Sequence, residues 1–227
     1  MKRLHVLLVA GGLCLIVGTA ARAQMGMEMF KKPAIADIFK PVVGSGAVYE
    51  TEREQKKSTM EMSVVAQEAV DGKEAYWVEF GHSDARSPTM AYGKMLITKD
   101  DFQFHRMIFQ QPGQPPMELP MNMNPRQKSQ MSDEIEKWHK VATESITVPA
   151  GTFVCEHWAK DDGKGDVWAS SKITPMSMVK EVTPTSSMVL VKVTTDAKDH
   201  ITGTPMKFDP EAMKRQMIQK QQQQNPQ

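Results

Sequence analysis

The chain is poor in cysteine, with only two in 227 residues. Cys14 lies in an N-terminal segment that we expect to be removed, which leaves Cys155 as the only thiol of the mature protein. No intrachain disulfide can form with a single cysteine. Cys155 follows the strand-like run Thr152-Phe153-Val154. An unpaired cysteine in such a run usually behaves as a small buried hydrophobic residue, so we expect this role over that of a catalytic or dimer-forming thiol.

The sequence also lacks features that would indicate several common functions. After residue 23 no apolar run approaches the roughly 20 residues that a membrane-spanning helix needs. A Gly-rich phosphate-binding loop is missing as well. Removal of Lys2, Arg3 and Arg22 leaves 25 basic residues against 27 acidic ones. This near-balance favours neither nucleic acid nor an anionic membrane surface as a partner.

The first 23 residues have the pattern of an export signal. Lys2 and Arg3 give a positive start, residues 4–17 are mostly apolar, and Ala21-Arg22-Ala23 is a small-x-small cleavage pattern. We therefore predict cleavage near Ala23-Gln24 and a periplasmic or secreted location, most simply the bacterial periplasm.

The remaining 204 residues are enough for one full core. We predict a Met-rich flexible leader at 24–32, a single β domain at 33–205, and a C-terminal helix with a Gln-rich disordered tail at 206–227. A Pro/Met-rich excursion interrupts the domain at 111–130, because proline lacks the donor that a central strand needs. Short amphipathic or capped segments predict helices over residues 32–43, 132–140 and 209–220.

Alternating apolar and polar residues dominate the rest of the chain and predict strands. The clearest unit is a hairpin of residues 58–70 and 73–81, because Asp71-Gly72 suits a tight turn with positive φ angles. Other pairs are expected at 90–98 with 102–110, 152–160 with 166–170, and 178–183 with 187–195. We therefore predict a mainly β (α+β) chain, a curved antiparallel meander or half-barrel of about nine strands with two or three peripheral helices.

Some predicted strands are apolar on both faces, as in Tyr76-Trp77-Val78 and Met188-Val189-Leu190-Val191. An antiparallel sheet with one wet face should instead alternate apolar and polar residues. A helix or a bound apolar molecule is thus expected to cover the second face of these strands.

Residues 146–156 (ITVPAGTFVCE), 165–170 (GDVWAS) and 177–182 (SMVKEV) follow a recognisable order. The segment of about residues 144–195 resembles a family of secreted bacterial proteins of unknown function, in which a VPAGTF turn precedes a Trp-containing strand and a GLVK-like strand. Ser177-Met178 replaces the more usual Gly-Leu. The resemblance implies a curved sheet similar to the periplasmic lipoprotein carriers and their receptors (LolA/LolB-like), whose half-barrel holds acyl chains. It implies no activity.

These observations favour a non-catalytic protein that binds an apolar or lipid-like small molecule. Strand position alone selects the expected lining residues Tyr76, Val78, Phe80, Met95, Trp168 and Leu190. The competing hypothesis is a periplasmic Cu(I)-binding protein, because thioethers are soft ligands. Its candidate ligands are Met25, Met27, Met29, Met117, Met121 and Met123, although no histidine is interleaved with them. A third hypothesis is an envelope interaction module whose Pro/Met-rich segment docks on a protein partner.

Catalysis is not expected. The five histidines after the signal are scattered and show no helical i, i+4 pair or closed zinc-ligand spacing. Gly44-Ser45-Gly46 is not a nucleophile elbow. Asp100-Asp101 and Asp161-Asp162 fall in predicted turns, where carboxylates accept backbone hydrogen bonds. We therefore expect neither an enzyme nor a required cofactor.

Overall fold

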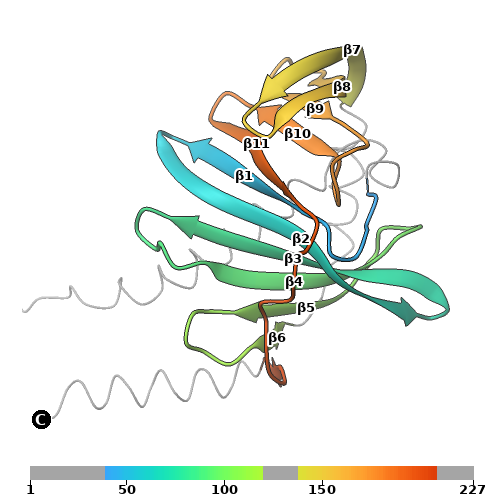
Figure 1. The fold of residues 1–227 in the computed structure, drawn as a ribbon, viewed down its shortest axis with the longest axis vertical. Coiled ribbons are helices and arrows are strands. Elements are labelled where there is room, and N and C mark those ends of the chain that lie inside the picture. Colours follow the sequence, from blue (N-terminus) through green and yellow to red (C-terminus); the bar gives the residue numbers. More distant parts are fainter. Residues whose placement is uncertain (1–38, 120–137, 209–227) are drawn as a thin grey trace, which may run out of the picture.

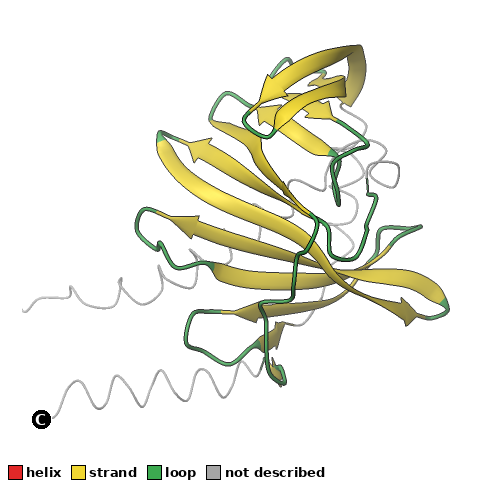
Figure 2. Ribbon diagram, in the orientation of Figure 1, coloured by secondary structure: helices red, strands yellow, loops and turns green. Residues whose placement is uncertain are grey.

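The computed structural model describes residues 39–119 and 138–208, and strands dominate this part of the chain. Within these residues twelve strands form one open sheet, and Figure 2 shows strands and loops only. No helix of the described part is long and apolar enough to cross a membrane.

The first six strands form a meander in which each strand pairs with the next in antiparallel fashion. Their bounds are β1 Gly46–Arg53, β2 Lys56–Val70, β3 Lys73–Asp84, β4 Ala91–Thr98, β5 Phe104–Gln110 and β6 Met117–Leu119. The predicted hairpin is confirmed as β2–β3, where Asp71 and Gly72 have φ angles of 50° and 79°. The turn chemistry therefore fixes this register, as positive φ angles at both central residues require.

A second antiparallel meander follows and contains the next five strands. These are β7 Trp138–Val148, β8 Gly151–Lys160, β9 Asp166–Ala169, β10 Met178–Val182 and β11 Ser186–Thr194. The tip of the β7–β8 hairpin turns back toward β11, where the Ala150 N–H donates to the Leu190 carbonyl at 3.4 Å.

The two meanders join at a seam between the first strand and the last long one. β1 pairs antiparallel with β11, from Gly46 opposite Thr194 to Arg53 opposite Ser186. The order across the sheet is therefore β12-β6-β5-β4-β3-β2-β1-β11-β10-β9-β8-β7. The last strand, β12 (Met206–Lys207), adds to β6 as a parallel pair.

The predicted fold class is wrong in its helices, its strand number and its shape. The described residues hold twelve strands in an open sheet and no helix, instead of about nine strands in a half-barrel with peripheral helices. Trp138 to Lys140, expected to end a helix, begin β7 because they pair with the Trp158–Lys160 end of β8. Cross-strand pairing here overrides local helix propensity. Residues 39–43 are irregular, and residues 206–208 extend the sheet.

Other predicted segments lie outside the described residues. These are the export signal, the Met-rich leader, the core of the predicted helix at 132–140, and the segment 209–227. The structure describes the excursion predicted at 111–130 only as far as Leu119. Its last three described residues, Met117–Leu119, form the short strand β6.

The sheet buries apolar side chains on both faces. We call the face that carries Tyr49, Val78 and Leu190 the inner face. The opposite face, which carries Trp77 and Leu96, is called the back face. Successive residues of a strand point to opposite faces, so Tyr76 and Val78 of β3 lie on the inner face and Trp77 lies on the back face. The two-sided apolar pattern seen in the sequence therefore serves two separate clusters.

Candidate functional site

The inner face carries one apolar cluster that draws on both meanders. Tyr49, Val64, Val78, Ile97 and Leu190 are completely buried in it. It is rich in methionine: Met60 packs against it, and its members include Met62, Met95, Met107, Met176, Met178 and Met188. Unbranched thioether side chains adapt to irregular spaces, so this cluster can repack more readily than one built from branched residues.

Most of the predicted lining residues meet in this cluster. Tyr76, Val78, Met95 and Leu190 are between 0% and 7% exposed, and Phe80 is partly buried against them. Trp168 also packs against the cluster, but it is partly buried and takes part in a polar network. An apolar ligand at the four buried residues would have to displace the protein's own side chains.

Two irregular segments insert side chains over the inner cluster. One is residues 39–43, which contributes Phe39, and the other is the loop of residues 170–177, which contributes Ile173 and Met176. All three side chains are at most 2% exposed. The segments are tied together by the Lys40 N–H, which donates to the Pro175 carbonyl at 2.8 Å. We call these two segments the loop cover.

A few backbone contacts fix the ends of the loop cover. The Ser170 N–H donates to the Ser177 carbonyl at 2.6 Å, and the Ser177 N–H donates to the Ile173 carbonyl at 2.8 Å. Below them the Tyr49 hydroxyl donates to the Met178 carbonyl at 3.1 Å. Burial raises the pKa of Tyr49, so this hydroxyl stays protonated and serves as a neutral donor inside the cluster.

Cys155 belongs to the same cluster. It is 1% exposed, and its Sγ lies 3.6 Å from the Phe153 carbonyl. Burial raises the pKa of the thiol to about 11, and the nearby Glu144 carboxylate adds to the rise. A nucleophilic cysteine needs the opposite shift, so the structure agrees with the role of a buried hydrophobic residue.

Trp168 forms a polar network with side chains of neighbouring strands. Its indole N–H donates to Glu144 at 2.7 Å, and its ring stacks on His157 with centroids 4.4 Å apart. His157 also contacts Asp166 at 2.7 Å, and the Lys180 ammonium lies 4.9 Å from the ring of Trp168. These contacts occupy Trp168, so it acts as a packing and hydrogen-bonding residue in this structure.

Only one of the six candidate copper ligands lies in the part of the chain that the structure describes. Met117 lies in β6, opposite Phe109 of β5 and Met206 of β12. The other candidates, Met25, Met27, Met29, Met121 and Met123, lie outside the described residues. Within residues 39–119 and 138–208, no group of three or more His, Cys, Asp or Glu side chains is placed to hold a metal ion.

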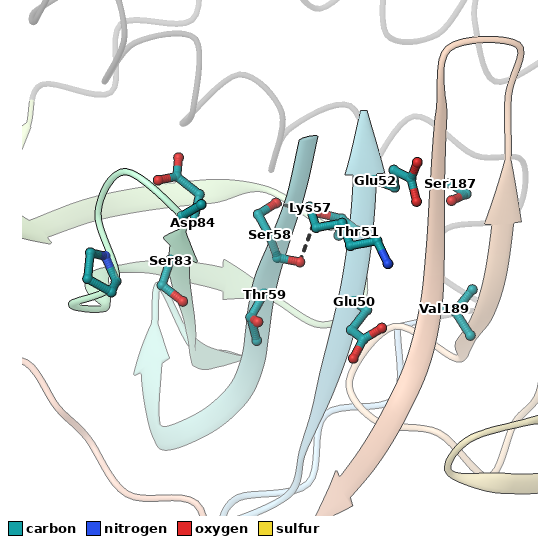
Figure 3. Close-up of a pocket in the computed structure, with 12 residues that line it drawn as sticks. Glu50, Thr51, Glu52, Lys57, Ser58, Thr59, Ser83, Asp84, Ser187 and Val189 are labelled. Atoms are coloured by element: carbon teal, nitrogen blue, oxygen red, sulfur yellow. Dashed lines mark hydrogen bonds between the residues drawn. The ribbon is translucent and has the colours of Figure 1, made fainter. Parts of the chain in front are cut away.

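A polar hollow of about 560 Å³ lies near one end of strands β1, β2, β3 and β11 (Figure 3). Its wall carries the carboxylates of Glu50, Glu52 and Asp84 together with Lys57. Hydroxyl and small side chains complete it: Thr51, Ser58, Thr59, Ser83, Ala85, Pro88, Ser187 and Val189. Its volume is in the range of small-molecule sites, but such sites are mostly apolar. None of the predicted lining residues contributes to it.

The back face carries a smaller cluster of Ala75, Trp77, Leu96 and Ile108. The chain itself covers this cluster. Residues 195–208, which we call the C-terminal strap, leave β11 and run across β2 to β5 to reach β6 (Figure 1). Ile201 of the strap is 5% exposed and packs into the cluster.

A buried carboxylate holds the C-terminal strap. Glu79 is 2% exposed and accepts the His200 backbone N–H at 3.0 Å and the His200 Nδ1 at 2.7 Å. Burial raises the pKa of Glu79, the two hydrogen bonds from His200 counteract that rise, and the Asp199 side chain adds to it. Lys94 pairs with Asp199 on the strap, and His200 stacks on Tyr92 with ring centroids 4.3 Å apart.

Sequence reasoning missed both Glu79 and the strap. The available signal was a single charge in the otherwise apolar run Tyr76-Trp77-Val78-Glu79-Phe80. A carboxylate on a covered face needs hydrogen-bond donors, so Glu79 indicated a polar partner on that face. The position of the partner, 121 residues further along the chain, could not be read from the sequence.

Comparisons with known proteins give structural neighbours only. No family model matches the chain, and no curated protein matches it. A candidate lipoprotein from Parabacteroides distasonis is 15% identical, with a TM-score of 0.37 over 69% of this chain and 97% of that one. A candidate exported protein with a YmcC-like fold from Bacteroides fragilis is 12% identical, with a TM-score of 0.37 over 69% and 98%.

A chain of the MucA/MucB complex of Pseudomonas aeruginosa is 12% identical, with a TM-score of 0.43 over 78% of this chain and 60% of that one. Two of these three neighbours are described as a lipoprotein or as an exported protein. At these identities and TM-scores the likeness supports no conclusion about what this chain binds.

Proposed function

We propose that this chain is an exported, non-catalytic protein that binds an apolar or lipid-like molecule against the inner face of its sheet. The observation that carries the proposal is the Met-rich inner cluster, which extends across the seam into both meanders beneath the loop cover. Thioether side chains can rearrange around an apolar chain, and burial of an acyl chain contributes about 0.8 kcal/mol per CH₂ group.

Binding would begin with displacement of the loop cover. Ile173 and Met176 belong to the same buried cluster as Val78 and Leu190. Their loop is held by the Lys40–Pro175 contact and by its own short-range hydrogen bonds. Elements held by few contacts open at a lower free energy than the sheet beneath them. In this proposal an acyl chain takes the place of these two side chains.

Native mass spectrometry of the full chain, purified from the envelope fraction, tests the proposal directly. We expect a bound mass in the range of a lipid that is lost on collisional heating. The environment-sensitive dye 1-N-phenylnaphthylamine provides a second readout, with palmitate as competitor. Binding of the dye should be stronger in Ile173→Ala, because a loop cover that buries a smaller apolar side chain opens more easily.

Lys172→Ala is the matched control, since Lys172 lies in the same loop and is exposed. It should bind the dye as the wild type does. The proposal fails if no lipid is bound and if neither the wild type nor Ile173→Ala binds the dye in a palmitate-sensitive way.

A further inference from the structure

The C-terminal strap touches the sheet through few buried groups. Ile201 is the only buried residue among residues 195–208, and ten of these fourteen residues are exposed. The surface beneath is different, since Ala75, Trp77, Leu96 and Ile108 are between 0% and 6% exposed. A segment with one buried anchor separates from a sheet at a lower free energy than the strands within it do.

The surface under the C-terminal strap has the parts of a peptide-binding groove. The apolar cluster forms a socket for one aliphatic side chain, here Ile201. Beside it, Glu79 accepts a backbone N–H and an imidazole N–H, and Lys94 pairs with the Asp199 carboxylate. These contacts recognise three successive residues, Asp199-His200-Ile201, by charge, hydrogen bonding and shape.

The sheet edge at β6 extends the groove. The Met206 N–H donates to the Pro116 carbonyl and the Phe208 N–H donates to the Glu118 carbonyl, both at 2.9 Å. An extended peptide that adds to a sheet edge in this way gains affinity from main-chain hydrogen bonds, while pockets for side chains give specificity. The groove and the edge together use both features.

We propose that the back face is a binding site for an extended peptide segment and that residues 195–208 are its resident occupant. The exchanging occupant is a segment of a protein partner that presents an acidic residue, a histidine and an aliphatic residue in succession. The partner would bind where the strap now lies. This inference is independent of the proposed lipid site on the inner face.

Competition with the tethered strap predicts a measurable difference in affinity. A short tether gives a segment an effective concentration in the millimolar range. A peptide added in solution should therefore bind the wild type roughly a hundredfold more weakly than a protein whose strap has lost its anchors.

The probe is a fluorescein-labelled synthetic peptide of residues 195–208, followed by fluorescence anisotropy with the full chain. The double variant His200→Ala/Ile201→Ala should bind it with saturation at one peptide per chain, and the wild type should bind roughly a hundredfold more weakly. Lys198→Ala is the matched control, because Lys198 lies in the strap and is exposed. It should behave as the wild type.

Two further arms separate recognition from general exposure of apolar surface. Adding Glu79→Ala to the double variant should weaken peptide binding at least tenfold, because the His200 N–H groups of the peptide lose their acceptor. A peptide of the same composition in scrambled order should not bind. Equal binding of the two peptides would overturn the proposal.

Hydrogen exchange of the wild type gives a test that does not depend on a variant folding. The amides of His200 and Ile201 should exchange faster than those of Leu96 and Ile97 in β4, because the strap opens separately from the sheet. Equally slow exchange of all four amides would show that the strap opens only with global unfolding, and the proposal would then be wrong. A folded double variant that does not bind the peptide would also refute it.

Discussion

The inner and back faces of β3 to β5 both bury large apolar side chains, but they are covered in different ways. The inner cluster crosses the seam and receives side chains from both meanders. The back cluster takes its strand residues from the first meander only and is covered by the C-terminal strap. The strap is held there by the buried side chain of Ile201 and by the hydrogen bonds of His200 to the Glu79 carboxylate. Similar apolar strands can thus belong to a continuous core on one face and to a groove closed by a single segment on the other.

The largest expected difference between the faces concerns two leucines. Leu190 and Leu96 are 0% and 1% exposed, on the inner and back face respectively. Leu190→Ala should lower the free energy of unfolding by about 3–5 kcal/mol and Leu96→Ala by about 2–3 kcal/mol. The strap can settle into the space left at Leu96, whereas Leu190 is enclosed by the seam. Urea unfolding monitored by Trp fluorescence measures both.

Val154→Ala is the reference for this pair, because Val154 is 61% exposed, and it should change stability by less than about 0.5 kcal/mol. Equal losses for Leu190→Ala and Leu96→Ala would contradict the difference between the two faces.

A smaller effect is expected from the strap itself. Ile201→Ala should lower the free energy of global unfolding by less than about 2 kcal/mol, because release of the strap limits the loss. It should also increase tryptic cleavage after Lys198 severalfold, since the strap spends more time detached. Limited proteolysis followed by mass spectrometry measures the cleavage, and Thr202→Ala, at an exposed strap residue, is the control. Unchanged cleavage in Ile201→Ala would argue that Ile201 does not anchor the strap.

The smallest effect on stability near neutral pH, and the most direct report on closure of the inner face, comes from Cys155. Its pKa of about 11 lies above the value of about 8.5 for a thiol in an unfolded chain. The folded protein therefore keeps a proton that the unfolded chain releases between these values. Stability should be unaffected by this group below about pH 8.5 and should fall as the pH rises toward about 11.

At pH 8 the thiol of the folded protein should react with Ellman's reagent far more slowly than that of the urea-unfolded chain. Cys155→Val should remove the thiol's contribution to the alkaline loss of stability. Rapid reaction in the native state would mean that the inner face is open near Cys155.

The hairpins were predictable because their determinants are local. Asp71-Gly72 and the alternation around it were enough to predict β2 and β3, and the pair β8–β9 was placed close to its observed bounds. The two-sided pattern at Tyr76-Trp77-Val78 correctly predicted a second cover. The cover was expected to be a helix or a bound apolar molecule, and this expectation is wrong for Trp77, whose cluster is covered by the C-terminal strap. The strap has no periodic apolar pattern and contributes a single side chain, Ile201, from more than 100 residues further along the chain.

Other errors arose where pairing outweighs local preference. Trp138 to Lys140 have the composition of a helix end, but β8 offers them hydrogen-bond partners that the sequence cannot reveal. Strands β6 and β12 are only three and two residues long, too short for any alternation to be seen. Most of the candidate lining residues lie in or against the inner cluster, which also contains Ile173 and Met176 from a loop that no periodic pattern in the sequence indicated.

The seam between β1 and β11 has a consequence for the order of events during folding. Each meander is built from neighbouring hairpins and can form early, but the second neighbour of β1 lies about 140 residues further along the chain. Until Ser186–Thr194 is available, Gly46–Arg53 presents a bare edge of main-chain donors and acceptors. Contacts of such high sequence separation slow folding, so an incompletely folded chain is most exposed to misassociation at this stretch, and a chaperone would have the longest time to act there.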